Sequence, residues 1–568
     1  MAIATNIPSA SIDQISSDND PMSAAELHMP TCRGTDIQVL TIPQLQKCLT
    51  ERKFFSRDLV ETYFERIQRL NCLLKAVIQT NADALVIAEC LDKERENGKL
   101  RGPLHGIPFL VKDNIATKDG VATTAGSTML VGSTVPDDAH VVSMLRDAGA
   151  ILLGHTNLSE WAAMRSSYYS EGYSSRGGQC RNPYNLAEHP GGSSCGSAVA
   201  VATNMCPFSL GTETDGSIMF PADRNAVVGI KPTVGLTSTK GVIPESSSLD
   251  TVGSFGKTVL DAAIALDAIT GDSKSGENSP SSHKSHGMSS YASFVTNKAA
   301  LKTARFGLPW TRVWESAYKK TEKYNGLMVL LKEIENAGAE VIRWTNFPSA
   351  EEIISPSGWD WDFPSKSGRP DQSEFMVVKK EFFNEIRSYL SNLSTNPNGI
   401  QSLEDIMAWN VKNSETDGGR PCVHPAWPSG QDNFERSLTS KGILDDTYHS
   451  ALKYIRRKSR EEGIDAALRM PDGSVLDGIL VPLQGDSGAA CQVAAKAGYP
   501  MIAIPTCTSE ITGVPFGIAL IQTAWREDLL IRYGSAIEDL VGGRPKPHFR
   551  NIEASNFMYV GSKPDRPC

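Results

Sequence analysis

The sequence predicts an α/β protein in which a largely buried sheet is covered by helices. Residues 106–114 (GIPFLVKDN) and 150–157 (AILLGHTN) are short apolar runs that end in polar residues, as buried strands do. Residues 138–150 (DAHVVSMLRDAGA) lie between them and have a helical pattern. A strand, a helix and a second strand in this order are typical of such a sheet.

Composition places the chain among ordinary globular proteins. Of its 568 residues, 40% are hydrophobic and 21% are charged, which excludes disorder throughout. The net charge is −9 with no long block of Lys and Arg, so no nucleic-acid partner is expected. No 18 apolar residues run together and the N-terminus lacks a signal pattern, so we predict a cytoplasmic protein with no membrane partner. The 11 cysteines include no Cys-x-x-Cys pair, which favours reduced thiols over a disulfide framework or a zinc site.

The remaining elements follow in chain order. Residues 1–35 are predicted to be a polar N-terminal extension, and residues 36–560 a single domain. Residues 56–70 form a predicted amphipathic helix with Ser56 as N-cap and with an apolar face of Leu59, Val60, Tyr63, Phe64 and Ile67. The α/β pattern resumes near the C-terminus with predicted strands at 479–483, 502–506 and 516–521 and a helix at 526–543.

Two irregular segments interrupt this pattern, at about 272–295 and 345–372. The first is rich in Ser, His and Gly and is predicted to be a surface loop. The second is rich in Trp and Pro and is predicted to be either a loop or a cover on the substrate side.

The stretch HPGGSSCGSAVAVATNM, residues 189–205, passes directly from a Gly/Ser tract into small apolar residues. Gly/Ser linkers are usually followed by more polar sequence. An active-site loop is the alternative, in which the glycines permit close backbone approach and the Ala/Val run is a buried helix that anchors the serines. This stretch alone leaves both interpretations open.

A second informative stretch begins with the predicted strand PFSLG, which leads into a tight turn at Asp215 and Gly216, followed by Ser217. Successive backbone N–H groups in such a turn can bind an anion. A phosphate loop is disfavoured because the pattern GxxxxGK[ST] is absent. A nucleophilic serine also needs a base, but neither His105 nor His189 lies in a recognisable Ser-His-Asp context, so we interpret both as hydrogen-bonded loop residues.

Lys112 is the other candidate base, because it lies in an otherwise apolar strand. Burial lowers the pKa of a lysine, and a neutral amine can accept a proton. A strand-end lysine that pairs with Asp113 or reaches solvent is the competing interpretation.

Three separated motifs resemble those of the amidase signature family of serine hydrolases. They are HGIPFLVKDN, GGSSCGSAVAV, and GTETDGSIMFPA followed by VVGIKPT, and the likeness extends over residues 40–545 outside the irregular segments. The resemblance implies a large mixed sheet covered by helices and a triad of a serine, a cis-serine and a lysine. By position these are Ser217 as nucleophile, Ser193 as proton relay and Lys112 as base, with a cis peptide bond between Gly192 and Ser193.

The resemblance also implies the reaction. Ser217 would attack the carbonyl of a small-molecule amide, the N–H groups of Thr214, Asp215, Gly216 and Ser217 would bind the oxyanion, and water would release the acid from the acyl-enzyme. No metal or organic cofactor is expected. Family members are often dimers, so the resemblance makes a homodimer possible, but the sequence itself does not give the oligomeric state. An esterase, an acyl-transferring enzyme and a catalytically silent binding protein remain alternatives. Deamidation of glutaminyl-tRNA is disfavoured, since no basic surface is evident.

Three positions depart from the commonest family pattern. Cys195 and Asp215 stand where glycines are usual, and Met219 where arginine is usual. We expect Cys195 to be a packed thiol and the Asp215 side chain to point away from the oxyanion, and we consider Arg224 a substitute for the missing arginine. Residues 123–130 and 359–363 are the predicted pocket segments.

Overall fold

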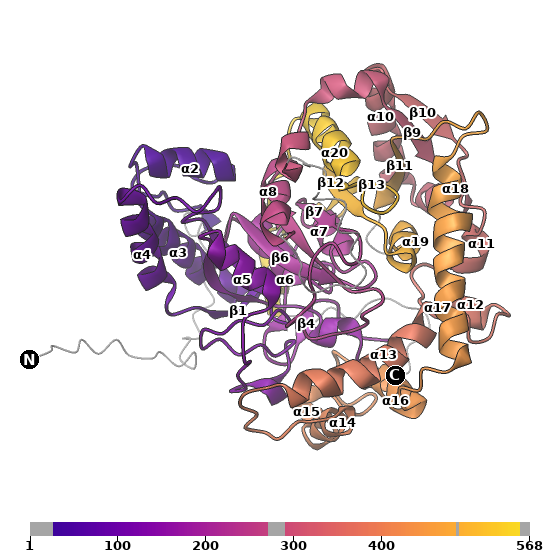
Figure 1. The fold of residues 1–568 in the computed structure, drawn as a ribbon, viewed down its shortest axis with the longest axis horizontal. Helices are drawn as coiled ribbons and strands as arrows, with labels where there is room; N and C mark the ends of the chain where they lie inside the picture. Colours follow the sequence, from indigo (N-terminus) through magenta and orange to yellow (C-terminus); the bar gives the residue numbers. More distant parts are fainter. Residues whose placement is uncertain (1–26, 271–289, 484–487, 557–568) are drawn as a thin grey trace, which may run out of the picture.

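A computed structural model describes residues 27–270, 290–483 and 488–556 of the chain. In these ranges 11 strands form one sheet through the middle of the molecule, in the order β1-β3-β2-β6-β8-β7-β12-β13-β11-β9-β10 (Figure 1). The strands are β1 (Val77–Thr80), β2 (Pro108–Lys112), β3 (Ile151–Thr156), β6 (Phe208–Glu213), β7 (Val228–Lys231), β8 (Thr251–Gly256), β9 (Arg305–Leu308), β10 (Glu340–Arg343), β11 (Gly478–Leu483), β12 (Met501–Thr508) and β13 (Pro515–Ile521). A separate hairpin pairs β4 (Tyr173–Ser174) with β5 (Gly178–Gln179).

The sheet is mixed, with parallel pairing both among β9, β10 and β11 and where the serine and lysine motifs meet. Strand β2 is parallel to both of its neighbours, β3 and β6. Strand β6 is antiparallel to β8 on its other side, and β8 is antiparallel to β7. The predicted α/β fold with a large mixed sheet is therefore confirmed.

Helices cover the sheet and extend beyond both of its ends (Figure 1). The helices before the nucleophile motif are α2 (Ile42–Thr50), α3 (Ser56–Leu74), α4 (Ala84–Glu96), α5 (His140–Asp147) and α6 (Cys195–Ala202). Those that follow are α7 (Met219–Arg224), α8 (Val259–Ile269), α9 (Glu315–Tyr318), α10 (Thr321–Asn336), α11 (Ala350–Ile353), α12 (Phe363–Lys366), α13 (Glu374–Ser391), α14 (Leu403–Lys412), α15 (Ser414–Asp417), α16 (Asp432–Ser440), α17 (Asp446–Ser459), α18 (Asp465–Leu468), α19 (Ala489–Ala497) and α20 (Glu527–Val541).

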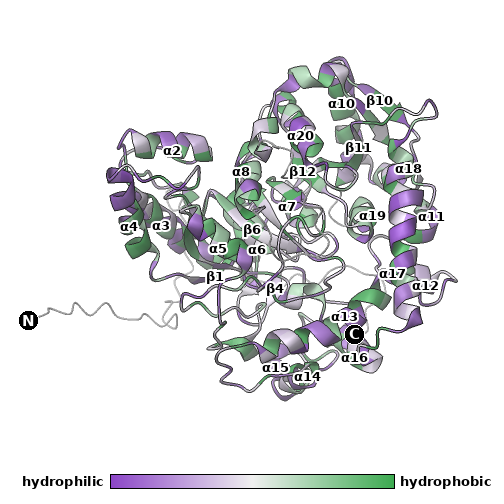
Figure 2. Ribbon diagram, viewed as in Figure 1, coloured by the Kyte–Doolittle hydropathy of each residue, from purple (hydrophilic) through white to green (hydrophobic). Residues whose placement is uncertain are grey.

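Hydrophobic residues concentrate on the central strands and on the helices packed against them, whereas hydrophilic residues dominate outer helices such as α17 (Figure 2). One large apolar cluster contains the strands and the helices against them. A second cluster joins helices α13, α14 and α16 to residues around Met129 and Trp161. No helix among the described residues is long and apolar enough to cross a bilayer.

Helix α6 is buried along its whole length and directly follows the paired serines. Its first turn approaches the backbone of the sheet, because the amide of Gly196 donates to the carbonyl of Asn157 at 3.0 Å. A Cβ at Gly196 would lie 2.3 Å from the carbonyl oxygen of Ala76 and 2.5 Å from the amide nitrogen of Asn157. The glycine therefore sets how closely the serine segment approaches the sheet.

The predicted elements recur with small shifts of their ends. The helix predicted at 56–70 is α3, but its N-cap is Phe55 rather than Ser56, which is already helical. Asp92 accepts from the amide of Ser56 at 2.8 Å, so a distant side chain does the capping expected of the serine.

The two irregular segments have different outcomes. Most of the segment 272–295 and residues 1–26 of the polar extension lie outside the described residues. The segment 345–372 contains two one-turn helices, α11 and α12. The expectation of reduced thiols does not hold at Cys422, which is disulfide-bonded, whereas the other cysteines of the described residues are free thiols.

We expect Gly196→Ala to lower the free energy of unfolding by about 1–3 kcal/mol, because the new methyl group meets backbone atoms that cannot move aside. Gly326→Ala is the control, since its Cβ would lie 3.1 Å from the ring edge of Phe516 and the substitution favours helix α10. Urea denaturation measures both. Equal stability of the two variants would contradict the close contact at Gly196.

Candidate active site

Lys112 lies at the C-terminal end of strand β2, and its side chain is completely buried. Its Nζ lies 2.7 Å from Ser193 Oγ, 2.8 Å from Thr212 Oγ1 and 3.2 Å from the Thr212 carbonyl oxygen. Asp113 instead accepts from Gly126 and Arg176 and contacts His155 Nδ1 at 2.8 Å. The amine of Lys112 thus faces the predicted relay serine. The competing interpretation, in which Lys112 pairs with Asp113, is wrong.

Ser193 connects Lys112 to Ser217. The Oγ of Ser193 donates to the Oγ of Ser217 at 2.9 Å, and the peptide bond between Gly192 and Ser193 is cis, as expected. The exposed fraction of the residue rises along the series, from 0% for Lys112 to 2% for Ser193 and 7% for Ser217. A ligand arriving from solvent would therefore meet Ser217 first.

Burial lowers the pKa of Lys112 from 10.5 to about 8, and the nearby carboxyl groups oppose this shift only in so far as they are ionised. The contacts of its Nζ suit either protonation state. An ammonium donates to all three oxygens while Ser193 donates to Ser217. A neutral amine donates to the two Thr212 oxygens and accepts from Ser193, whose oxygen then accepts the proton of Ser217 in turn. A neutral Lys112 can take a proton from Ser193.

The predicted oxyanion turn follows strand β6 at residues 214–217. Gly216 has φ +86°, which favours glycine at this point of the turn. None of the backbone N–H groups of residues 214–217 donates to another group in the described part of the chain, so all four remain available to a ligand. Glu213 accepts from the amides of Ile218 at 2.6 Å and Met219 at 3.0 Å, which fixes the chain immediately after Ser217.

The carboxylate of Asp215 is directed at Trp359, in keeping with the expectation that it points away from the oxyanion. Its Oδ2 accepts from the indole Nε1 of Trp359 at 2.8 Å. Burial raises the pKa of Asp215, and the nearby Lys496 opposes this rise. Lys496 in turn forms an ion pair with the buried Glu374 at 3.2 Å. The predicted substrate-side segment around Trp359 therefore contacts the turn that carries Ser217.

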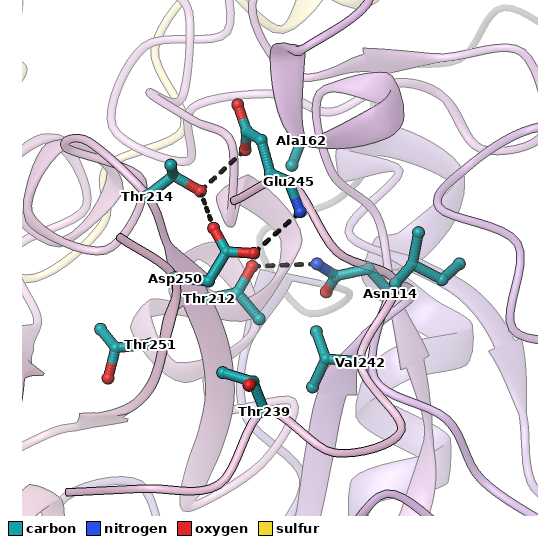
Figure 3. Close-up of a pocket in the computed structure, with 10 residues that line it drawn as sticks. Asn114, Ala162, Thr212, Thr214, Thr239, Val242, Glu245, Asp250 and Thr251 are labelled. Carbon is teal, nitrogen blue, oxygen red and sulfur yellow. Dashed lines mark hydrogen bonds between the residues drawn. The ribbon is translucent and has the colours of Figure 1, made fainter. Parts of the chain in front are cut away.

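A small cavity of about 10 Å³ lies beside Thr212 and Thr214 (Figure 3). A cavity of this size is at the lower limit for holding one water molecule. Two carboxyl groups, Glu245 and Asp250, line the cavity and both contact the hydroxyl of Thr214. Asn114 also lines it, donating through Nδ2 to Thr212 Oγ1 at 3.0 Å.

Of the polar residues around this cavity, only Thr214 was identified from the sequence. Asn114 and Thr212 lie within quoted motifs, at positions that a closer inspection of the two strand ends could have singled out. Glu245 and Asp250 lie in the segment PESSSLD, which has no pattern that predicts proximity to Lys112.

The two histidines considered as bases are loop residues, as interpreted from the sequence. The Nε2 of His105 lies 2.9 Å from the carbonyl oxygen of Leu91. The Nδ1 of His189 accepts from the amide of Gly191 at 3.2 Å.

Cys195 and Arg224, which the sequence analysis singled out, and the neighbouring Ser194 support the serine segment. Burial raises the pKa of Cys195 well above its ordinary value, in keeping with a packed thiol. Arg224 donates to the carbonyl of His189 at 2.8 Å, so it braces the segment before the two glycines. Ser194 Oγ donates to the carbonyl of Thr212 at 3.0 Å, which joins the serine segment to strand β6.

The predicted pocket segment 123–130 is attached to the residue that follows Lys112. The amides of Thr124 and Ala125 donate to the carbonyl of Asp113 at 3.1 and 2.9 Å. The Asp113 carboxylate accepts from Gly126 N at 3.0 Å. The end of strand β2 therefore holds both the lysine and this segment.

Comparison with known proteins identifies the family. The Amidase family model matches residues 58–418. The chain belongs to the amidase family. An amidase-named protein of Schizosaccharomyces pombe is 48% identical over 534 residues, which cover 93% of this chain and 90% of that protein. An amidase-named protein of Arabidopsis thaliana is 37% identical over 516 residues, which cover 90% of this chain and 92% of that protein.

A solved amidase structure shares the fold over nearly the whole chain. The peptide amidase of Stenotrophomonas maltophilia superposes with a TM-score of 0.77 at 36% identity, covering 90% of this chain and 99% of that chain. With the family match and the amidase-named relatives, this likeness makes the chain an amidase, a hydrolase of carbon–nitrogen bonds. In the described part of this amidase, no group of three or more His, Cys, Asp or Glu residues is arranged to hold a metal ion.

We expect Trp359→Phe to lower kcat/KM for an amide substrate by roughly 10- to 100-fold, because the Asp215 carboxylate loses its indole donor and is free to turn toward the 214–217 amides. Trp361→Phe is the control, since the Trp361 ring packs on Trp359 and Phe375. Steady-state kinetics of both variants measure the difference. An equal effect of the two substitutions would show that only ring packing matters.

Proposed function

We propose that this amidase is a serine hydrolase in which Ser217 forms an acyl-enzyme, Ser193 relays the proton and Lys112 is the base. The observation that supports this most strongly is the continuous series from Lys112 Nζ through Ser193 Oγ to Ser217 Oγ, with separations of 2.7 and 2.9 Å. These separations are within the range for direct proton transfer along hydrogen bonds.

In the proposed reaction, neutral Lys112 takes the proton of Ser193 while Ser193 takes that of Ser217. The Ser217 oxygen attacks the amide carbonyl, and the N–H groups of residues 214–217 stabilise the oxyanion. The protonated Lys112 then returns its proton through Ser193 to the leaving amine. Water, activated by the same series, releases the carboxylic acid.

We propose a small amide as substrate, and peptide amides are the first class to test. The peptide amidase of Stenotrophomonas maltophilia shares 36% identity and 90% coverage of this chain, which supports starting there. Peptide amides, aryl amides, aliphatic amides and the corresponding esters should be compared by kcat/KM. The panel separates amide hydrolysis from preferential ester cleavage.

A fluorophosphonate probe tests the nucleophile. We expect one adduct, on Ser217, and we expect Ser217→Ala to abolish both labelling and amide hydrolysis, since the substitution removes the only atom that would form the covalent bond. Cys195→Ala is the control and should label fully. Mass spectrometry locates the adduct. Labelling of Ser217→Ala at another residue, or near-normal hydrolysis by it, would refute the assignment, and no labelling of the wild type would favour the silent-protein alternative.

The pH dependence of kcat/KM tests the base. An ammonium cannot accept a proton, so activity should rise with pH through the Lys112 pKa of about 8. Lys112→Arg and Lys112→Ala should each lose roughly 10²–10⁴-fold or more, because neither side chain can act as a neutral amine base. The exposed Lys118→Arg serves as the control. A Lys112→Arg enzyme that keeps most of its activity would show that the lysine acts only as a fixed cation.

A further inference from the structure

The hydroxyl of Thr214 contacts two carboxyl groups at once. Thr214 Oγ1 lies 2.9 Å from Glu245 Oε2 and 2.5 Å from Asp250 Oδ1 (Figure 3). A hydroxyl group has one proton to donate. Thr214 can therefore donate to only one of these oxygens, and the second contact requires a proton on a carboxyl group.

The backbone around Asp250 indicates which carboxyl group is ionised. Asp250 Oδ2 accepts from the amides of Glu245 at 2.8 Å and Ser246 at 2.9 Å. Hydrogen bonds from N–H groups stabilise the charged form of a carboxyl group. Thr214 then donates its proton to Asp250, and the contact that remains is an O–H donated by Glu245 to Thr214 Oγ1.

We propose that Glu245 is a neutral carboxylic acid that holds Thr214 in place and limits the Glu245–Asp250 pair to a single negative charge beside Lys112. Glu245 is a positioning residue here, since it acts through Thr214 and through its effect on Lys112. The part of this inference that concerns Lys112 rests on the proposed function, whereas the protonation state of Glu245 does not.

The location of the pair explains why its charge matters. Thr212, which contacts the amine of Lys112, lines the same small cavity as Glu245 and Asp250. A second negative charge there would stabilise the ammonium form of Lys112 and so oppose its use as a base. With a single negative charge on the pair, burial remains the dominant effect on the pKa of Lys112, and that pKa stays lowered.

Other groups also act on the pair and on Lys112. Burial and the neighbouring carboxyl group raise the pKa of Glu245 well above its ordinary value, and burial raises the pKa of Asp250 to about 6. The titratable groups that interact electrostatically with the pair or with the amine are Lys112, Tyr169, Cys195, Glu213, Asp215, Glu381 and Glu385.

The first experiment compares amide substitutions in pH profiles of kcat/KM. Glu245→Gln should keep the wild-type midpoint, because it replaces a neutral acid by a neutral amide whose N–H₂ can donate to Thr214. Asp250→Asn should lower the midpoint by roughly one unit, because it removes the charge that stabilises the ammonium of Lys112. Glu245→Ala should lose roughly 10- to 100-fold in kcat/KM, and Glu245→Gln should recover most of that loss.

The second experiment does not depend on catalysis. Infrared spectra at pH 8 detect the C=O stretch of a protonated carboxylic acid. The contribution of Glu245 to this band should be lost in Glu245→Gln, which lowers the band's intensity. The same contribution should remain in Asp250→Asn. Glu94→Gln is the control, because Glu94 lies at the surface and pairs with Arg101, and it should leave the band unchanged.

An unchanged infrared band in Glu245→Gln would overturn the proposal. A downward shift of the pH midpoint in Glu245→Gln equal to that in Asp250→Asn would overturn it as well, since both groups would then be ionised. Failure of the proposed function can be told apart from failure of this inference. If the proposed function is wrong, the Lys112 variants keep their activity, but the infrared result for Glu245 does not change.

Discussion

The whole site depends on keeping an amine out of water. Lys112 is completely buried at the end of a strand, where an ammonium loses its hydration and the pKa falls to about 8. Two oxygens of Thr212 and the hydroxyl of Ser193 are the polar contacts that make this burial tolerable. The same contacts aim the amine at the serine that we propose as its proton source.

The sheet brings these groups together from distant parts of the chain. Strands β2 and β6 are parallel neighbours, so Lys112 and the 214–217 turn leave the same edge of the sheet. Helix α6 packs on these strands and carries the serine segment to that edge, with Gly196 permitting the close approach. Lys112 and Ser193 are 81 positions apart in sequence, yet their side chains are in hydrogen-bond contact.

Local pattern predicted six strands of the sheet, β2, β3, β6, β11, β12 and β13, whereas β1, β7, β8, β9 and β10 were not assigned. The buried helix was one of two open interpretations of the Gly/Ser stretch, and the proposed triad came from the family resemblance. The sequence left open whether Lys112 pairs with Asp113, because Asp113 is the first residue after strand β2, where strand alternation no longer sets the direction of a side chain. Asp113 accepts from Gly126 and contacts His155 instead. The contact of Thr214 with Glu245 and Asp250 was beyond prediction, since it depends on how the 242–250 segment packs on the turn. Helix α13 was also not assigned, although its apolar periodicity is clear once its bounds are known.

The pKa of Lys112 is the quantity on which the mechanism depends most directly. It can be measured by an NMR titration of the Lys112 amine in protein carrying ¹⁵N-labelled lysine, with Lys112→Arg to assign the signal. A midpoint near 8 is expected if burial keeps the amine available as a base. A midpoint at the ordinary lysine value of 10.5 would leave Lys112 a cation at neutral pH and would contradict its role as the base.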